Sequence, residues 1–179
     1  LIVDFAIREN ISINNLKKYL GPGPFINQRA EYATTEEMMK RVGVKAPDPM
    51  TIVGQLSGGN QQKVVIARWL NHHCKVLIFD EPTAVLTPQE IDELMKIMKN
   101  LAKEGKSILF ITHKLNEIME VADRCTILRK GKYIGTVNIS ETSKEELSRM
   151  MVGRNVSFSV NKKPSKPGDT VLKVEHMTV

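Results

Sequence analysis

The chain has 179 residues, 41% of them hydrophobic and 26% charged, with a formal net charge of +6. This length fits one large domain, or one domain and a fragment of another, and the composition is that of an ordinary globular protein. No run of about 18 apolar residues predicts a membrane-spanning helix, and the dispersed lysines give little support to nucleic-acid binding. Because the sequence starts in mid-pattern at Leu1, without an initiator methionine or signal peptide, we expect a piece of a longer protein.

The first half of the chain, residues 1–72, is predicted to be a helical subdomain. The breaker cluster Leu20-Gly21-Pro22-Gly23-Pro24 predicts a loop. The segment Thr34-Thr35-Glu36-Glu37 has the pattern of a capping box that opens a helix ending near Val42. A second helix is expected over 58–71, where apolar residues recur at helical spacing.

Residues 73–153 alternate between strand and helix patterns, which predicts an α/β region with a largely parallel sheet. The continuous apolar run Val76–Phe79 is typical of a strand buried on both faces. Thr87, followed by a proline and, at position 90, a glutamate, is a strong helix start. The expected elements are a strand over 76–79, a helix over 88–104, a strand over 107–112, a helix over 115–122, strands over 125–128 and 133–137, and a helix over 143–153.

The composition changes after residue 153. Residues 154–170 are interpreted as a linker, because the stretch 162–169 is polar and rich in proline. Residues 171–179 begin with an alternating apolar pattern, which predicts the first strand of a further domain cut off at Val179.

Two patterns that suggest ligand binding are rejected. His72-His73-Cys74 lacks a second cluster of ligands, so Cys74 and Cys125 are interpreted as free thiols of a cytosolic protein. Glu104-Gly105-Lys106-Ser107 ends like a phosphate-binding P-loop. However, it joins a helix to a strand, whereas a P-loop joins a strand to a helix.

Polar side chains follow the two predicted parallel strands. Asp80 and Glu81 come directly after the first strand, and His113 follows the second. Ligands collect at the carboxyl ends of such strands, so one carboxylate is a candidate for binding Mg²⁺ and the other for activating water. His113 is a candidate phosphate contact. Each feature alone is also compatible with an ordinary exposed loop.

The stretch Leu56-Ser57-Gly58-Gly59-Asn60 stands at the start of the helix over 58–71. Ser57 is explained as a helix cap. The two glycines are not, because glycine weakens a helix start but lets a ligand approach the backbone. The free amide groups of a helix N-terminus attract phosphate, so the sequence predicts an anion contact at this position.

Taken in order, these features resemble the ATP-binding cassette (ABC) ATPases. Residues 56–62, LSGGNQQ, match the signature motif; residues 76–81 match the Walker B strand with its catalytic glutamate; and His113 matches the switch histidine. The form of the signature and the layout most resemble the ATPase subunits of simple-sugar and nucleoside importers. In that family two cassettes are fused, and residues 171–179 would start the second.

The resemblance implies a partial P-loop NTPase-like fold and two cofactors, ATP and Mg²⁺. Two cassettes close head to tail on ATP, with the signature of one facing the nucleotide of the other. The nucleotide-binding residues would be Ser57, Gly58, Gly59, Asn60 and Gln61. In the other motifs, Asp80 would support Mg²⁺, Glu81 would polarise water and His113 would sense the γ-phosphate.

The implied partners are a second cassette in the same or another polypeptide, transmembrane permease subunits and, indirectly, a solute-binding protein, and no nucleic acid is expected. The implied location is the cytoplasmic side of the membrane.

The sequence departs from the family in lacking the Walker A motif, the adenine-stacking aromatic residue and the glutamine that faces the permease. It also has Ala84-Val85-Leu86-Thr87 where a D-loop aspartate is usual. Residues 1–80 look more like a second cassette and those from 82 onward like a first, which suggests two halves joined at Asp80–Thr83.

Three functions follow from this reading. The first is the ATPase component of a sugar or nucleoside importer, present as an incomplete cassette. The second is a non-transport ABC protein acting on ribosomes or nucleic acid, for which the usual long basic insertions are missing. The third is a fragment that presents a signature surface and is inactive alone, because the Walker A motif is absent.

Overall fold

The structure is a computed structural model that describes residues 1–21, 25–154, 168–169 and 172–173. The predicted linker over 154–170 and the predicted strand within 171–179 lie largely outside these residues. In chain order, the elements are α1 (Ile7–Ser12), η1 (Ile13–Tyr19), α2 (Gln28–Val42), η2 (Val53–Gln55), α3 (Gly58–Asn71), β1 (Val76–Asp80), α4 (Pro88–Lys103), β2 (Ser107–Ile111), α5 (Leu115–Val121), β3 (Arg124–Arg129), β4 (Lys132–Asn138), η3 (Ile139–Glu141) and α6 (Lys144–Val152).

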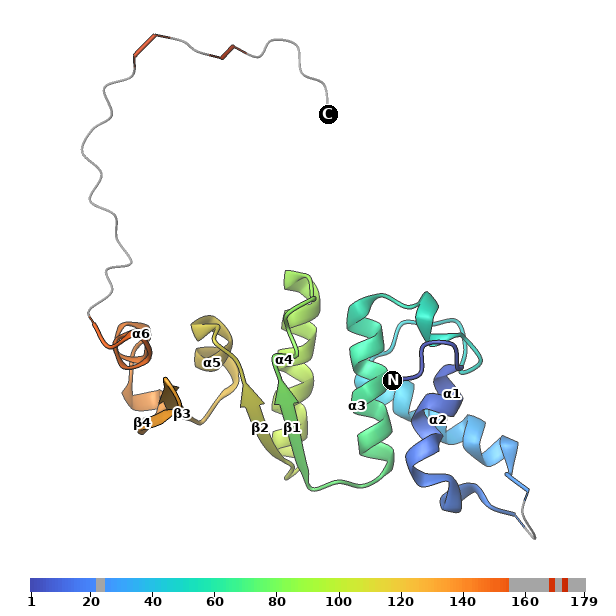
Figure 1. Cartoon of the computed structure of the whole chain (residues 1–179). Coiled ribbons are helices and arrows are strands. Elements are labelled where there is room, and N and C mark those ends of the chain that lie inside the picture. Colours follow the sequence, from blue (N-terminus) through green and yellow to red (C-terminus); the bar gives the residue numbers. More distant parts are fainter. Residues whose placement is uncertain (22–24, 155–167, 170–171, 174–179) are drawn as a thin grey trace.

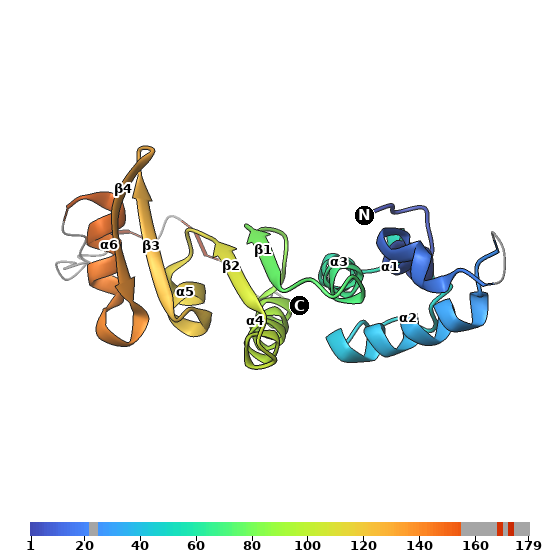
Figure 2. The ribbon, with the colours of Figure 1, turned by 90° about the horizontal axis from the view of Figure 1, so that it is seen from below.

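The elements stand in a row that follows their order in the chain (Figures 1 and 2). Helices α1, α2 and α3 gather at one end, β1 and β2 lie with α4 in the middle, and the hairpin β3–β4 lies with α5 and α6 at the other end. None of the helices among the described residues is both long and apolar enough to cross a membrane. The combination of helices and parallel strands agrees with the predicted α/β class.

Helix α2 starts earlier than the sequence predicted. The side chain of Asn27 caps it by accepting a hydrogen bond from the amide of Ala30 at 3.0 Å, and Gly43, with a φ of 68°, ends it. The expected capping box lies inside the helix. There the Thr35 hydroxyl donates to the carbonyl of Glu31 at 2.8 Å, which threonine can do within a helix without ending it.

One apolar core joins the helical end of the molecule to its middle. Ile7, Ile11 and Val64 are completely buried in it, together with Met95 and Met98 of α4. Since these residues come from α1, α3 and α4, their packing holds α3 beside α4. This neighbourhood places the start of α3 next to the start of α4.

Strands β1 and β2 pair in parallel, with Phe79 opposite Phe110 and Asp80 opposite Ile111. Contrary to the prediction, β1 is buried on one face only. Leu77 and Phe79 belong to the core, but Ile78 is 67% exposed. The physical reason is that core residues cover a single face of this two-stranded sheet.

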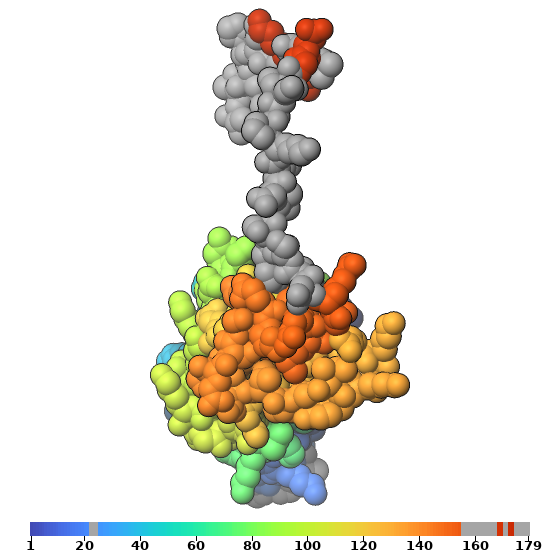
Figure 3. Space-filling view, turned by 90° about the vertical axis from the view of Figure 1, so that its left-hand side faces the viewer, coloured from blue at the N-terminus to red at the C-terminus, as the bar shows by residue number. Residues whose placement is uncertain are grey.

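The last two strands form a separate antiparallel hairpin, so the parallel part of the fold is limited to β1 and β2. Lys130 and Gly131, with φ angles of 50° and 73°, make a turn that is too short for the crossover required between parallel strands. Ile118, Ile127 and Leu147 form the buried centre of this end. Figure 3 shows the outer surface of this end, with the hairpin and α6 facing the viewer.

Helix α4 has the predicted ends. Thr87 and Glu90 form a reciprocal capping box around Pro88. Gly105 follows the helix with a φ of 86°, and β2 begins two residues later. The helix–turn–strand order around Gly105 confirms that this stretch is not a P-loop.

Candidate functional site

The signature residues lie at the beginning of α3, as predicted. Ser57 is the N-cap, and its hydroxyl oxygen accepts from the backbone amide of Asn60 at 3.4 Å and from the Asn60 side chain at 3.1 Å. Ser57 and Gly58 are exposed, whereas Gly59 is buried. The first turn therefore presents polar donors at an accessible helix end.

These donors already hold an anionic group supplied by α4. One carboxylate oxygen of Glu90, Oε1, accepts from the Ser57 hydroxyl at 3.0 Å and from the Gly59 amide at 3.2 Å. A Cβ atom at position 59 would lie 2.5 Å from both the Cδ and Oε1 atoms of Glu90. Glycine at this position is thus explained by the close approach of a carboxylate to the backbone.

The second oxygen of Glu90, Oε2, accepts from the Thr87 amide and hydroxyl, both at 3.1 Å. Hydrogen bonds from Thr87, followed by that from Ser57, lower the pKa of Glu90 because they favour its charged form. Sequence reasoning identified Glu90 as part of a capping box and missed its contact with α3. No local pattern signals that contact, because it depends on the packing of two helices.

The other two predicted nucleotide-binding residues make local contacts. The Asn60 side-chain oxygen accepts from the amide of Lys45 at 2.8 Å, and the Gln61 side chain donates to the carbonyl of Leu56 at 3.1 Å. Both side chains therefore hold the loop that leads into α3. The structure places them beside the signature glycines, with their polar groups engaged within the chain.

Glu81 and His113 are brought into contact, as their positions after neighbouring parallel strands suggested. The Nδ1 atom of His113 lies 2.8 Å from Oε1 of Glu81, and the Glu81 amide donates to the carbonyl of Ile111 at 3.0 Å. Oε2 of Glu81 is buried without a hydrogen-bond partner among the described residues. Glu81 also has a φ of 44°, a strained value for a residue other than glycine and one that often occurs at functional sites.

Asp80 lies at the exposed end of β1, and its carboxylate makes no hydrogen bond or ion pair with a described residue. No group of three potential metal ligands occurs in the part of the chain that the structure describes. Mg²⁺ keeps several water molecules and uses one or two carboxylates together with phosphate oxygens. The exposed carboxylate of Asp80 fits this requirement.

The segment that follows Glu81 is held by a residue that sequence reasoning missed. The ammonium group of Lys114 donates to the carbonyl and hydroxyl oxygens of Thr83, at 3.1 and 3.0 Å. Thr83 is buried. Since Lys114 directly follows His113, this contact fixes the two strand ends relative to each other.

A second acidic contact between α3 and α4 lies one helical turn after Glu90. Glu93 pairs with Lys45 at 2.8 Å and with the buried Lys63 at 2.5 Å. Hydrogen bonds from Lys45 and then Lys63 lower the pKa of Glu93 to about 2. This cluster keeps α4 against α3 while Glu90 lies at the signature.

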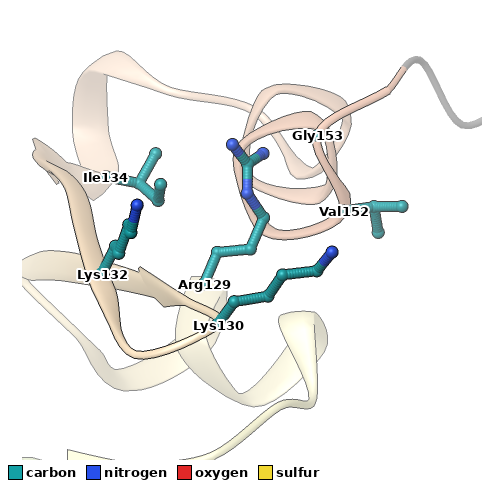
Figure 4. Close-up of a pocket in the computed structure, with 6 residues that line it drawn as sticks. All are labelled: Arg129, Lys130, Lys132, Ile134, Val152 and Gly153. Atoms are coloured by element: carbon teal, nitrogen blue, oxygen red, sulfur yellow. The ribbon is translucent and has the colours of Figure 1, made fainter.

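A basic pocket of about 370 Å³ lies away from this site, between the hairpin and α6 (Figure 4). Arg129 points across it toward the end of α6 and donates to the carbonyl of Met150 at 3.2 Å. Cations stabilise the C-terminal end of a helix, so this contact explains Arg129 structurally.

Comparisons with known proteins agree with the motifs. A family model described as ABC transporter matches residues 3–84. The nucleoside import ATP-binding protein NupA of Lactococcus lactis is 44% identical over 180 aligned residues, covering 100% of this chain and 35% of that protein. The ribose import ATP-binding protein RbsA of Hahella chejuensis is 45% identical over 153 residues, covering 86% of this chain and 30% of that protein. The chain thus spans about a third of the length of these curated relatives.

Solved structures have the same fold. The ATP-binding cassette MJ0796, in a dimeric post-hydrolysis state bound to ADP and Pi, superposes with a TM-score of 0.64 at 25% identity, covering 78% of this chain and 59% of that one. A metal-chelate-type ABC transporter in an inward-facing conformation gives a TM-score of 0.69 at 18% identity, covering 84% and 59% of the two chains. Identity of 44% along the whole chain, together with this shared fold, means that the chain belongs to the ATP-binding cassette (ABC) family of transporter ATP-binding proteins.

Proposed function

We propose that the chain is part of the ATP-binding subunit of an importer for a simple sugar or a nucleoside. The relatives named for nucleoside and ribose import support this substrate class. The same names favour an importer over the alternative of an ABC protein acting on ribosomes or nucleic acid. The expected partners are a second cassette, permease subunits and, indirectly, a solute-binding protein, at the cytoplasmic face of the membrane.

The observation that carries the proposal is that the signature residues hold an anionic group, the carboxylate of Glu90. The Ser57 hydroxyl and the Gly59 amide both donate hydrogen bonds to one carboxylate oxygen of Glu90. Their geometry therefore suits an anionic oxygen. Together with the amide of Gly58, an exposed residue, they would bind the γ-phosphate of an ATP molecule held by a second cassette. The helix dipole of α3 adds to this attraction.

The strand-end residues would act on a nucleotide bound to their own cassette. Glu81 would orient and polarise the attacking water, and His113 would hold the Glu81 carboxylate and contact the γ-phosphate. Asp80 would hold Mg²⁺, which when bound neutralises charge on the phosphates. In this proposal, residues 1–72 form the signature subdomain and residues 73–153 form the α/β part. Residues 154–170 are the linker, and a second cassette starts at residue 171.

The test is a chimera in which this chain replaces the aligned stretch of NupA. We expect the purified chimera to hydrolyse ATP within about tenfold of NupA itself, and Ser57→Ala to lower that rate about tenfold, since one hydrogen bond to a charged group is lost. The control is Ser143→Ala, because Ser143 caps α6 with the same geometry. A folded chimera that neither binds nor hydrolyses ATP would contradict the proposal.

A further inference from the structure

We infer that Glu90 is an internal competitor for the signature: its carboxylate occupies the phosphate-binding donors of α3 and must leave before a phosphate group can bind. The inference rests on the proposed function for the identity of the natural ligand. Its physical basis is the position of a carboxylate on the hydroxyl of Ser57 and the amide of Gly59.

The donors cannot serve both anions at once. The Ser57 hydroxyl has a single proton, and it points to Oε1 of Glu90 at 3.0 Å. The lone pairs of the same oxygen accept from Asn60. A phosphate oxygen that accepts from Ser57 therefore has to replace the carboxylate. Repulsion between two like charges at this distance also prevents joint occupancy.

No cationic side chain among the described residues forms an ion pair with Glu90. Its described partners are the neutral donors of Ser57, Gly59 and Thr87. Lys45 lies close enough to interact electrostatically with Glu90, but its ammonium pairs with Glu93. Once Glu90 has left, the field of Lys45 remains available to the incoming anion.

Release requires a side-chain rotation and no movement of α4. The ion pair between Glu93 and the buried Lys63 lies one turn further along α4 and stays intact. The Thr87 hydroxyl also continues to accept from the Glu90 amide, at 3.4 Å, so the helix remains capped. The helix that carries Glu90 thus stays fixed. The Glu90 side chain moves on and off the signature on the time scale of side-chain rotation.

The first experiment uses the intact chain and inorganic phosphate, with the amide resonances of residues 57–60 followed by NMR. The variant is Glu90→Gln, because glutamine also serves in a capping box while its neutral amide competes less strongly for the donors. We expect phosphate to perturb these resonances with a midpoint about tenfold lower in Glu90→Gln than in the unchanged chain. Glu145→Gln, an exposed charge change in the first turn of α6, is the control and should not shift the midpoint.

Equal midpoints in all three proteins, or no response of the Glu90→Gln variant, would overturn the inference. The second experiment measures the Michaelis constant for ATP in the NupA chimera, where Glu90→Gln should lower it and Glu145→Gln should not. If the phosphate midpoints shift but no chimera hydrolyses ATP, the proposed function fails while the competition by Glu90 stands. If the chimera is active and neither measurement responds to Glu90→Gln, the competition fails while the proposed function stands.

Discussion

Glu81 and His113 are separated by 32 positions in the chain, yet Oε1 of Glu81 lies 2.8 Å from Nδ1 of His113. The parallel register of β1 and β2 produces this contact, because both residues lie just beyond paired strand ends. One glutamate oxygen is thereby held, while the other is buried without a partner among the described residues. The contact with His113 therefore fixes the orientation of the Glu81 carboxylate at the carboxyl ends of the two strands.

The first prediction concerns this pair. In the NupA chimera, Glu81→Gln should lower the rate of ATP hydrolysis by about 10²–10⁴-fold, because the neutral amide cannot act as a general base. ATP binding, followed by equilibrium dialysis, should be retained. His113→Ala should lower the rate by a smaller factor. His72→Ala, at an exposed site away from the carboxyl ends of the strands, should leave the rate unchanged. A Glu81→Gln chimera with an undiminished rate would remove Glu81 from the mechanism.

The second prediction compares the two signature glycines. Gly59→Ala should reduce the free energy of unfolding by about 1–2 kcal/mol, because the added methyl group expels the Glu90 carboxylate from its hydrogen bonds. Gly58→Ala should not destabilise the protein, since the nearest atom lies 3.9 Å from its added Cβ and alanine favours a helix more than glycine does. Urea unfolding measures both. In a Glu90→Ala background most of the penalty of Gly59→Ala should disappear, and a penalty that persists would contradict the steric explanation.

The third prediction is a pH dependence of stability. The pKa of Glu93 in the folded protein is about 2, below its ordinary value of 4.5, because Lys45 and Lys63 donate to the charged form. The stabilisation is therefore complete above pH 4.5 and is lost as the pH falls toward 2. Chemical unfolding at several pH values should show a shallower acid decline for Glu93→Gln. The variant should also be less stable at neutral pH, because the buried Lys63 loses its ion pair. Glu120→Gln, in an exposed pair with Lys99, is the control.

The fourth prediction concerns the exposed face of the β1–β2 sheet. Val76, Ile78, Leu109 and Ile111 present a continuous apolar surface there, with exposures of 59%, 67%, 54% and 46%. Exposed apolar sheet surface favours association with other chains. Sedimentation velocity should show concentration-dependent self-association that Ile78→Lys reduces. Leu128→Lys, at an equally exposed apolar site on the hairpin, should not reduce self-association. Equal effects of the two substitutions would mean that net charge governs association.

The fifth prediction concerns nucleotide affinity. The sequence has no GxxxxGK stretch followed by serine or threonine, so the intact 179-residue chain lacks the backbone cradle and lysine that hold a triphosphate. Isothermal titration of the chain with ATP and Mg²⁺ should show no binding in the micromolar range. Micromolar affinity would show that the described residues form a nucleotide site of another kind.

The sequence alone was sufficient to locate the motifs and most of the elements around them. The cap at Ser57, the capping box at Thr87 and the turn at Gly105 depend on neighbouring residues, and the structure has all three. The start of α2 was placed wrongly because Thr35 and its neighbours also fit a helix interior, and only the packed helix shows that Asn27 is the cap.

Tertiary packing decided the features that depend on residues distant in the chain. The burial of β1 was predicted wrongly, because an apolar pattern shows which residues are suited to burial but not which faces are covered. The contact of Glu90 with Ser57 and Gly59 has the same origin: its capping role lies within four residues, whereas its contact with the signature exists only because α4 packs beside α3. Local hydrogen bonding can be deduced from neighbours in sequence, but an anion placed on a helix end by another helix requires the folded chain.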